Sequence, residues 1–260
     1  SSLVFLLTLI GGAYAQEKTK RVSLSGKVGT SLELYKMSSN DTNILDRRIP
    51  LNYRVYANAN IQVGKYFSMP FSLSMGKTHN SFLYPVPQYV TALQFVSNPL
   101  NGVGIAPKYK WVELLLGSQT LNYSDLSVGD VPIFGAGINL SPGKFRFSVF
   151  AGNSQFAVGQ DTSNGIEGIY SRKIYTAKIG VGEEENSHLY LVTSLMHDDT
   201  NSITSRPINI NPENGLSSSV VYRIKLNKKS FMSGEIAGSA FTRNSYSKEL
   251  SNEETKFLKP

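Results

Sequence analysis

The sequence predicts an all-β chain in which antiparallel strands follow one another up and down, and three observations lead to this prediction. Long stretches alternate apolar and polar residues, each stretch is longer than an ordinary soluble strand, and short turns alternate with long connections. A period of two places successive side chains on opposite faces of a sheet. The 22 Gly, 14 Tyr and 13 Phe residues also favour strands and turns.

Composition excludes several other classes of protein. The 260 residues are 40% hydrophobic and 17% charged, which is too apolar for a disordered chain. The chain has no cysteine, so disulfide frameworks, thiolate zinc sites, iron–sulfur clusters and cysteine nucleophiles are excluded. The net charge of +7 comes from basic residues scattered along the strands. We expect no nucleic-acid partner, because a nucleic-acid interface gathers basic residues on one surface.

The first residues are typical of an export signal. Residues 3–10 are apolar apart from Thr8, and residues 13–15, Ala-Tyr-Ala, form a small-x-small cleavage pattern ahead of Gln16. The apolar run is far shorter than the ~20 residues that span a bilayer, which disfavours an uncleaved anchor. We predict that residues 1–15 are a cleaved signal peptide. We also expect it to be truncated at its start, because no initiator Met or basic segment precedes it.

Alternation begins near Arg21 and continues through the predicted strands in order. The first strand places apolar residues at positions such as Val22 and Leu24, with polar residues between them. The second, over 52–63, is apolar at odd positions and polar at even positions. The third, over 67–76, repeats this pattern, and we expect a bulge at Pro70, which cannot donate to a ladder. Further strands are predicted near 105–117, 132–140, 144–155, 172–182, 187–197, 217–226 and 230–243.

The lengths of these strands predict a barrel that crosses a membrane. Strands in soluble proteins most often have about five or six residues, whereas these runs have about ten or more. A strand that rises ~3.4 Å per residue and tilts by ~45° needs about ten residues to cross an apolar band of ~25 Å. Aromatic residues near the strand ends fit an interfacial belt. We therefore predict an antiparallel up-and-down transmembrane β-barrel over residues 16–260.

Connection lengths give independent evidence, because membrane barrels have short periplasmic turns and longer outer loops. The short connections are 63–66, 141–144, 183–186 and 227–229, and the long ones are 38–50, 118–131, 156–171 and 198–216. The alternation fails by one step unless residues 88–96 form a further strand, which we predict. The chain then holds about 10–12 strands, with eleven as the count from these runs. Because bacterial single-chain barrels have even strand numbers, we expect the N-terminal part of a longer barrel.

Three blocks of sequence resemble a known family. They are Gly104-Ile-Ala-Pro-Lys-Tyr-Lys-Trp111, the stretch from Phe134 to Phe147, and Asp198-Asp-Thr-Asn-Ser202. Together these blocks look like signature segments of large uncharacterised outer-membrane β-barrel proteins of Bacteroidota, which are Gram-negative bacteria. The resemblance covers roughly residues 100–202 and consists of turn chemistry and interfacial aromatics. It implies export, an outer-membrane location and a longer parent chain, and it implies no substrate.

Motifs that would support enzyme chemistry are weak, so we predict that the protein is not an enzyme. His79, His188 and His197 have no metal-ligand spacing, and no G-x-S-x-G nucleophile elbow occurs. An outer-membrane lipase that uses His188 or His197 is a weakly supported alternative. The acidic residues of the 198–202 block could bind calcium in an outer loop, but a solvated loop is the better reading. We predict no catalytic residue, no cofactor and no metal site.

The predicted function is that of a porin-like channel or transport component in the outer membrane, at the cell surface. Its polar lumen would be lined by the even positions of the second and third strands: Arg54, Asn58, Asn60, Gln62, Ser72 and Ser74. The alternatives are a non-conducting structural or assembly component that binds a partner through its outer loops, and a soluble β-sandwich or barrel. Expected partners are outer-membrane lipid and lipopolysaccharide, with another surface or secreted protein as a further candidate.

Overall fold

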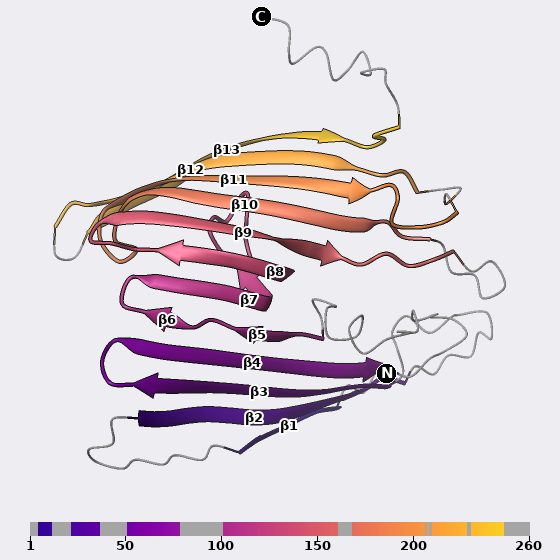
Figure 1. Ribbon diagram of the computed structural model, residues 1–260, viewed down its shortest axis with the longest axis horizontal. Coiled ribbons are helices and arrows are strands. Elements are labelled where there is room, and N and C mark those ends of the chain that lie inside the picture. Colours follow the sequence, from indigo (N-terminus) through magenta and orange to yellow (C-terminus); the bar gives the residue numbers. More distant parts are fainter. Residues whose placement is uncertain are drawn as a thin grey trace, which may run out of the picture.

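The computed structural model describes residues 5–11, 22–36, 51–78, 101–160, 168–205, 207, 210–227 and 230–246. Within this part of the chain all regular structure is β-strand, in one antiparallel 13-stranded sheet (Figure 1). The strands are Phe5–Gly11 (β1), Val22–Leu34 (β2), Leu51–Val63 (β3), Phe67–Thr78 (β4), Val103–Ile105 (β5), Lys108–Tyr109 (β6), Val112–Leu121 (β7), Val131–Leu140 (β8), Phe145–Gln155 (β9), Ser171–Gly182 (β10), His188–Asp199 (β11), Asn214–Lys225 (β12) and Phe231–Thr242 (β13).

Strand order follows chain order, which confirms the predicted all-β up-and-down arrangement. The path runs β1-β2-β3-β4-β5-β7-β8-β9-β10-β11-β12-β13, and β6 pairs with both β4 and β7. Most strands begin and end within a few residues of the predicted bounds, for example Val131–Leu140 where 132–140 was predicted. The ladders of the described residues run from β1 at one edge of the sheet to β13 at the other. Barrel closure therefore stays a prediction.

Residues 5–11 of the predicted signal peptide form an edge strand. This strand, β1, pairs with β2 in antiparallel register, from Phe5 opposite Leu34 to Gly11 opposite Val28. Removal of the signal peptide would make β2 the edge strand of the sheet. The edge of β2 would then present unpaired N–H and C=O groups, which a further strand could pair with.

The prediction of one strand over 105–117 is wrong, because this run contains a tight turn. β6 ends at Tyr109, which pairs with Val112 at the start of β7. Lys110 sits between them with φ of 55°, in the left-handed region. Pro107, which has no N–H, separates β5 from β6. The broken pair β5 and β6 thus acts as one additional strand between β4 and β7.

This turn restores the alternation of connection lengths without any strand at 88–96. The short connections β3–β4, β6–β7, β8–β9, β10–β11 and β12–β13 join strand pairs, and the longer connections lie between those pairs. The strand predicted at 88–96 lies outside the described residues. The alternation of short and long connections, which led to that prediction, follows instead from the short β6–β7 turn at Lys110 and Trp111.

The bulge predicted at Pro70 is also wrong. Pro70 pairs with Asn60, and the β3–β4 ladder runs without a shift from Asn52–Thr78 to Val63–Phe67. The Pro70 carbonyl accepts a hydrogen bond from the Ala106 N–H at 3.0 Å. Since the N–H and C=O of a strand residue face the same neighbour, the missing donor of Pro70 faces the break between β5 and β6. No ladder bond is lost there.

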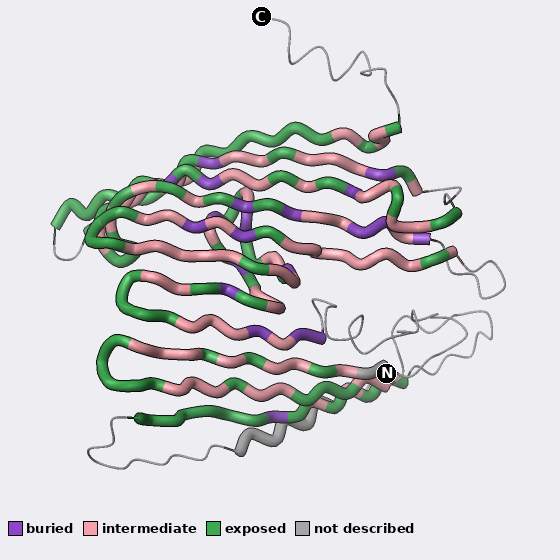
Figure 2. Tube along the Cα trace, viewed as in Figure 1, coloured by how far each residue is buried: buried purple, intermediate pink, exposed green. Residues whose placement is uncertain are grey.

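The hydrophobic core of the described residues is small and lies against β7 to β11. Figure 2 shows buried residues gathered mainly on these strands, whereas β2 to β4 and β13 are mostly intermediate or exposed. Within this core, Ile133 and Val192 are fully buried. The cluster consists of Leu115, Leu121, Val128, Ile133, Phe150, Ile174, Tyr190 and Val192.

The opposite face of the sheet carries large exposed hydrophobic side chains. On β10 and β11 these alternate with the buried residues, as at Ile179, Leu189 and Leu191. Strands at both ends of the sheet continue the pattern, with Leu24 at 65% and Ile236 at 74% relative exposure. We call the face that carries these hydrophobics the outer face, and the face that carries the core the inner face.

Candidate functional site

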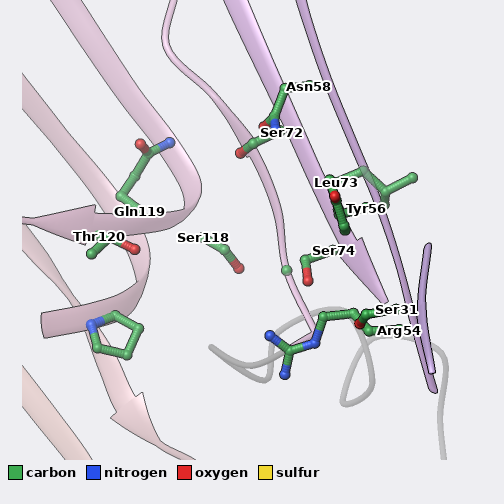
Figure 3. Close-up of a pocket in the computed structure, with 12 residues that line it drawn as sticks. Ser31, Arg54, Tyr56, Asn58, Ser72, Leu73, Ser74, Ser118, Gln119 and Thr120 are labelled. Carbon is green, nitrogen blue, oxygen red and sulfur yellow. The ribbon is translucent and has the colours of Figure 1, made fainter. Parts of the chain in front are cut away.

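A polar hollow of about 520 Å³ lies on the inner face, between β2–β4 and the first strands beyond the β5 break (Figure 3). Most of the residues that line it carry a hydroxyl or an amide. The lining residues are Ser31, Arg54, Tyr56, Asn58, Ser72, Leu73, Ser74, Gly102, Ser118, Gln119, Thr120 and Pro132. Figure 3 shows the side chains of Gln119, Ser118 and Thr120 on one side and those of Arg54, Ser74 and Asn58 on the other.

The hollow opens where the sheet ladder is interrupted. β5 has three residues and pairs with β7 only at Gly104–Gly117 and Ile105–Leu116. Gly117 has φ of +79°, and a Cβ there would lie 2.1 Å from the Val103 carbonyl oxygen, so only glycine fits. Beyond this pairing, residues 118–121 pair with β8 alone among the described strands. Their side chains can therefore border the hollow.

Four of the six residues predicted to line a lumen come together in this hollow. Arg54 and Asn58 of β3 lie beside Ser72 and Ser74 of β4, because the register pairs Asn58 with Ser72. Cross-strand partners share a face of the sheet. Even-numbered residues of both strands therefore lie on the inner face.

The other two predicted residues, Asn60 and Gln62, lie on the same face of β3 but outside the hollow, nearer the β3–β4 turn. The Gln62 Nε2 atom donates to the Gly64 carbonyl oxygen at 3.4 Å. The Asn60 Oδ1 atom is buried and has no hydrogen-bond partner among the described residues.

Sequence reasoning missed the side of the hollow that β7 supplies. Gln119 lies in the segment 118–131, which was predicted to be a long connection, whereas β7 continues to Leu121. Ser31 could have been found, because it pairs with Arg54 and falls on the polar positions of the first predicted strand. Tyr56 could also have been found from its even position in β3.

Glycines on the wall make room for the large polar side chains. A Cβ at Gly29 would lie 2.3 Å from the Tyr56 ring, so Tyr56 lies over the strand position that Gly29 leaves open. At Gly76, the atom closest to a Cβ would be the Tyr53 carbonyl oxygen at 3.2 Å, and the Arg54 Nε atom would lie at an ordinary contact distance. At Gly104, it would lie 2.9 Å from the Ser72 Oγ atom and 2.1 Å from the Ser118 carbonyl oxygen. These side chains can therefore lie along the wall instead of filling the hollow.

Backbone contacts hold several polar groups of the wall. The Gln119 Nε2 atom donates to the carbonyl oxygens of Ile105 at 3.2 Å and Leu116 at 3.0 Å. These bonds leave the amide oxygen of Gln119 available as an acceptor. The Ser72 hydroxyl donates to the Gly104 carbonyl oxygen at 3.4 Å. Next to the hollow, the Gly76 N–H donates to the Asn101 Oδ1 atom at 2.9 Å.

Among the described residues of the lining, Arg54 is the charged one, and no carboxylate belongs to this set. None of the ion pairs that join described residues includes Arg54. Its guanidinium is exposed. A guanidinium presents five donors in a planar fork that matches a carboxylate. The hollow thus combines one accessible cation with a wall of neutral polar groups.

A second feature of the inner face is the segment 122–130, the inward loop, which connects β7 to β8 and packs against later strands. A hairpin-like bridge joins Ser124 to Val128, whose side chain is 1% exposed within the core. The Ser124 hydroxyl lies 3.0 Å from the Ser219 hydroxyl of β12, and Ser127 lies 2.9 Å from the same group. In Figure 1 this segment, drawn in magenta, passes across β9 and β10.

Glu235 of β13 binds the tip of the inward loop. Its carboxylate accepts hydrogen bonds from the Ser124 hydroxyl, from the Asp125 N–H at 3.1 Å and from the Leu126 N–H at 3.3 Å. Hydrogen bonds to a charged acceptor are roughly twice as strong as neutral ones. The loop therefore spans the inner face from β7 to the far edge of the described sheet.

Tyr123 anchors the base of the inward loop against β9 and β10. Burial raises the pKa of Tyr123 to about 12, and the hydroxyls of Ser148 and Thr176 act in the opposite direction. The Lys178 Nζ atom lies 4.8 Å from the centre of the Tyr123 ring. A cation over a ring face is attracted to it.

The acidic block 198–202 is committed to ion pairs. The Asp198 carboxylate takes two hydrogen bonds from Arg172, at 2.7 and 2.8 Å, and Arg172 also reaches Glu213 at 2.7 Å. Lys173 binds Asp199 at 2.8 Å. These partners occupy the oxygens that a calcium ion would need. Among the described residues no group of three or more His, Cys, Asp or Glu side chains could hold a metal ion.

The histidines that the structure describes make ordinary local contacts. The His188 Nδ1 atom lies 3.2 Å from the Glu183 carbonyl oxygen, and the His197 Nδ1 atom lies 2.6 Å from Asn214 Oδ1. His79 lies outside the described residues. The catalytic pairing of a serine with His188 or His197 remains without a supporting contact in the part of the chain that is described.

Comparison with known proteins gives no matching family model, no matching curated protein and no matching solved structure. The described residues contain no helix that is long and apolar enough to cross a membrane. The function must therefore be argued from the two faces of the sheet and from the groups gathered on them.

Proposed function

We propose that the chain is part of an outer-membrane β-barrel that serves as a channel or transport component with a polar lumen. The observation that carries this proposal is the contrast between the two faces of the sheet. Large hydrophobic side chains stand exposed along the outer face, whereas the inner face of β2 to β4 is polar and borders the Arg54 hollow. Apolar-out and polar-in alternation is the pattern of a membrane barrel.

The outer face exposes more apolar surface than is usual for a protein in water. Soluble monomers rarely expose contiguous apolar patches larger than a few hundred Å². Here, large exposed hydrophobics recur from β2 to β13, including Val28 at 57% and Val181 at 55% relative exposure. Lipid would cover this surface, and each Å² of apolar area removed from water contributes roughly 25 cal/mol. In such a barrel the edge of β13, and the edge of β2 once residues 1–15 are removed, pair with further strands.

The membrane part of the proposal is tested by extraction and gel migration. The full-length protein is expected to require detergent for solubility and to migrate faster on a gel when unheated than when boiled. A protein that stays monodisperse without detergent would contradict the barrel, because its outer face would then have to be covered in another way. Such a result would favour the soluble β-sandwich or barrel.

The channel part of the proposal is tested by electrical recording. The refolded full-length protein is expected to produce discrete conductance steps in planar bilayers. Absence of current from a protein that passes the gel migration test would contradict the channel while leaving the barrel in place.

One observation favours the alternative of a non-conducting structural or assembly component. The inward loop crosses the inner face from β7 to β13 and is held there by Ser219 and Glu235. If it closes the lumen, the remaining function would lie in the long outer connections, which would bind a surface or secreted partner protein. Detergent dependence without conductance is the outcome expected for this alternative.

A further inference from the structure

We propose that the Arg54 hollow binds a small hydroxylated organic monoanion, such as a sugar acid, by pairing its carboxylate with Arg54 and its hydroxyls with the neutral wall. This inference builds on the proposed channel, for which it names the class of solute. The hollow of about 520 Å³ has the size of a small-molecule site.

The sign of the ligand charge follows from the charges of the wall. Among the described residues, Arg54 is the one charged residue that lines the hollow, and no ion pair to another of them neutralises it. A cationic solute would meet this guanidinium and no carboxylate from the described wall, which is unfavourable. An anionic solute would complete a charge-assisted pair.

Arg54 is placed so that a carboxylate in the hollow can reach it. It lines the hollow and is exposed to solvent. The planar fork of Arg can donate two parallel hydrogen bonds to one carboxylate. Because the pair stays partly hydrated, its contribution to binding is modest and screened by salt.

The rest of the ligand follows from the neutral wall. Ser31, Ser74, Ser118 and Thr120 supply hydroxyls, and Asn58 and Gln119 supply amides. Hydroxyl groups both donate and accept, so they match the hydroxyls of a carbohydrate. Gln119 is already held by two backbone carbonyls, and Ser72 by one, so part of the wall is ordered before a ligand enters.

Tyr56 supplies the apolar part of the site. Its ring lies over Gly29, whose absent side chain leaves room for it on the wall. An aromatic ring on the wall of a polar hollow offers a flat surface to the C–H faces of a sugar ring. The lining thus offers one cation, several hydroxyls and amides, and one aromatic ring.

The test compares three sugars of one size on the refolded full-length protein by isothermal titration calorimetry at low salt. Glucuronate is expected to bind about fivefold more tightly than glucose, and glucosamine, which is cationic, more weakly than glucose. Equal affinity for the three, or tighter binding of glucosamine, would overturn the inference. These measurements need no variant and no current, so they can fail or succeed independently of the proposed channel.

A pair of charge-removing variants locates the site. Arg54→Gln is expected to lower the affinity for glucuronate about fivefold, to the level of glucose. Lys108→Gln is the matched control, because Lys108 lies on the same face but far from Arg54. Lys108 pairs with Ser68 of β4, whereas Arg54 pairs with Gly76, eight residues further along the same strand. That separation is roughly 27 Å at ~3.4 Å per residue.

Two results of the variant pair would overturn the inference. One is an equal loss of glucuronate affinity in both variants, which would indicate general attraction to a basic protein. The other is full retention of glucuronate preference in Arg54→Gln. Arg54→Lys keeps the positive charge but not the planar fork of donors. Its affinity for glucuronate is expected to lie between those of the wild type and Arg54→Gln. If the wild-type protein prefers glucuronate but conducts no current, the result would contradict the channel and support the binding site.

Discussion

Small residues on the inner face decide where the large ones can lie. Gly29, Gly76 and Gly104 each stand next to a polar side chain or a carbonyl that a Cβ would approach. Glycine normally weakens a strand, because it packs nothing and loses more backbone entropy on folding than any other residue. At Gly29 and Gly104 the loss is offset by the room left for Tyr56 and Ser72.

Substitution at Gly29 tests this arrangement. Gly29→Ala is expected to lower the free energy of unfolding by about 1–3 kcal/mol, because the new methyl group overlaps the Tyr56 ring. Gly238→Ala is the control, since nothing lies within 4 Å of the Cβ position there. Urea unfolding of the refolded variants measures both. Equal stability of Gly29→Ala and Gly238→Ala would show that Tyr56 does not rest on Gly29.

The Arg172 ion pairs allow a second comparison at the level of single residues. Arg172→Met removes the two hydrogen bonds that Arg172 donates to the Asp198 carboxylate, whose side chain is 4% exposed, and leaves the bond from the Glu213 N–H. The expected loss of unfolding free energy is about 3 kcal/mol, near the low end for a broken buried pair because Arg172 itself is partly exposed. Lys173→Met breaks the more exposed pair with Asp199 and should cost less. Similar losses in the two variants, measured by urea unfolding, would contradict this ranking.

At the scale of elements, the inward loop depends on one carboxylate. Glu235→Gln keeps the shape of the side chain but removes the charge that accepts bonds from Ser124 and the loop backbone. We expect the free energy of unfolding to fall by about 1–3 kcal/mol, as for hydrogen bonds to a charged group. The control is Glu184→Gln, because Glu184 is 77% exposed and only 3.7 Å from Lys178. A loss for Glu235→Gln no larger than that for Glu184→Gln would show that Glu235 does not hold the inward loop.

Elements differ in how well their sequence specifies them. The ladder from β8 to β13 could be predicted, because its strands alternate regularly and its turns carry residues such as Pro142-Gly143 and Asn227. The β6–β7 turn could not, since Lys110 and Trp111 are not residues that favour a left-handed turn. Apolar residues continue through this turn, although they change from odd positions such as Ile105 and Tyr109 to even positions such as Leu116. The division of the 105–117 run into β5, β6 and β7 was therefore missed at the place where the hollow forms.

The candidate site was predictable to the extent that it follows from alternation. Arg54, Asn58, Ser72 and Ser74 were predicted because parity alone sets their face once the strands are identified. Gln119 and Ser118 were missed because their place depends on the interrupted ladder at Gly117. The inward loop was missed for a similar reason, since its partners on β12 and β13 are about a hundred residues away.

At the scale of the whole molecule, the predicted signal peptide fixes the N-terminus expected for the mature protein, which can be measured. If residues 1–15 are a signal peptide, the exported protein begins at Gln16 and β1 is absent from it. Mass spectrometry of protein recovered from the cell envelope is expected to find this N-terminus. Recovery of peptides from residues 5–11 in the mature protein would contradict the prediction and make β1 a permanent edge strand.

The bond between the inward loop and Glu235 also constrains the order in which the molecule assembles. Ser124 and Glu235 are separated by 111 residues, so their contact is among the most non-local that the described residues make. Contacts of such long range form late, because the intervening chain must first be ordered. During synthesis and strand-by-strand growth the loop would remain unsatisfied through β8, β9, β10 and β11. The loop can form its bonds only after β12 and β13 have joined the sheet. A loop bound to Ser219 and Glu235 therefore indicates that the sheet has formed at least as far as β13.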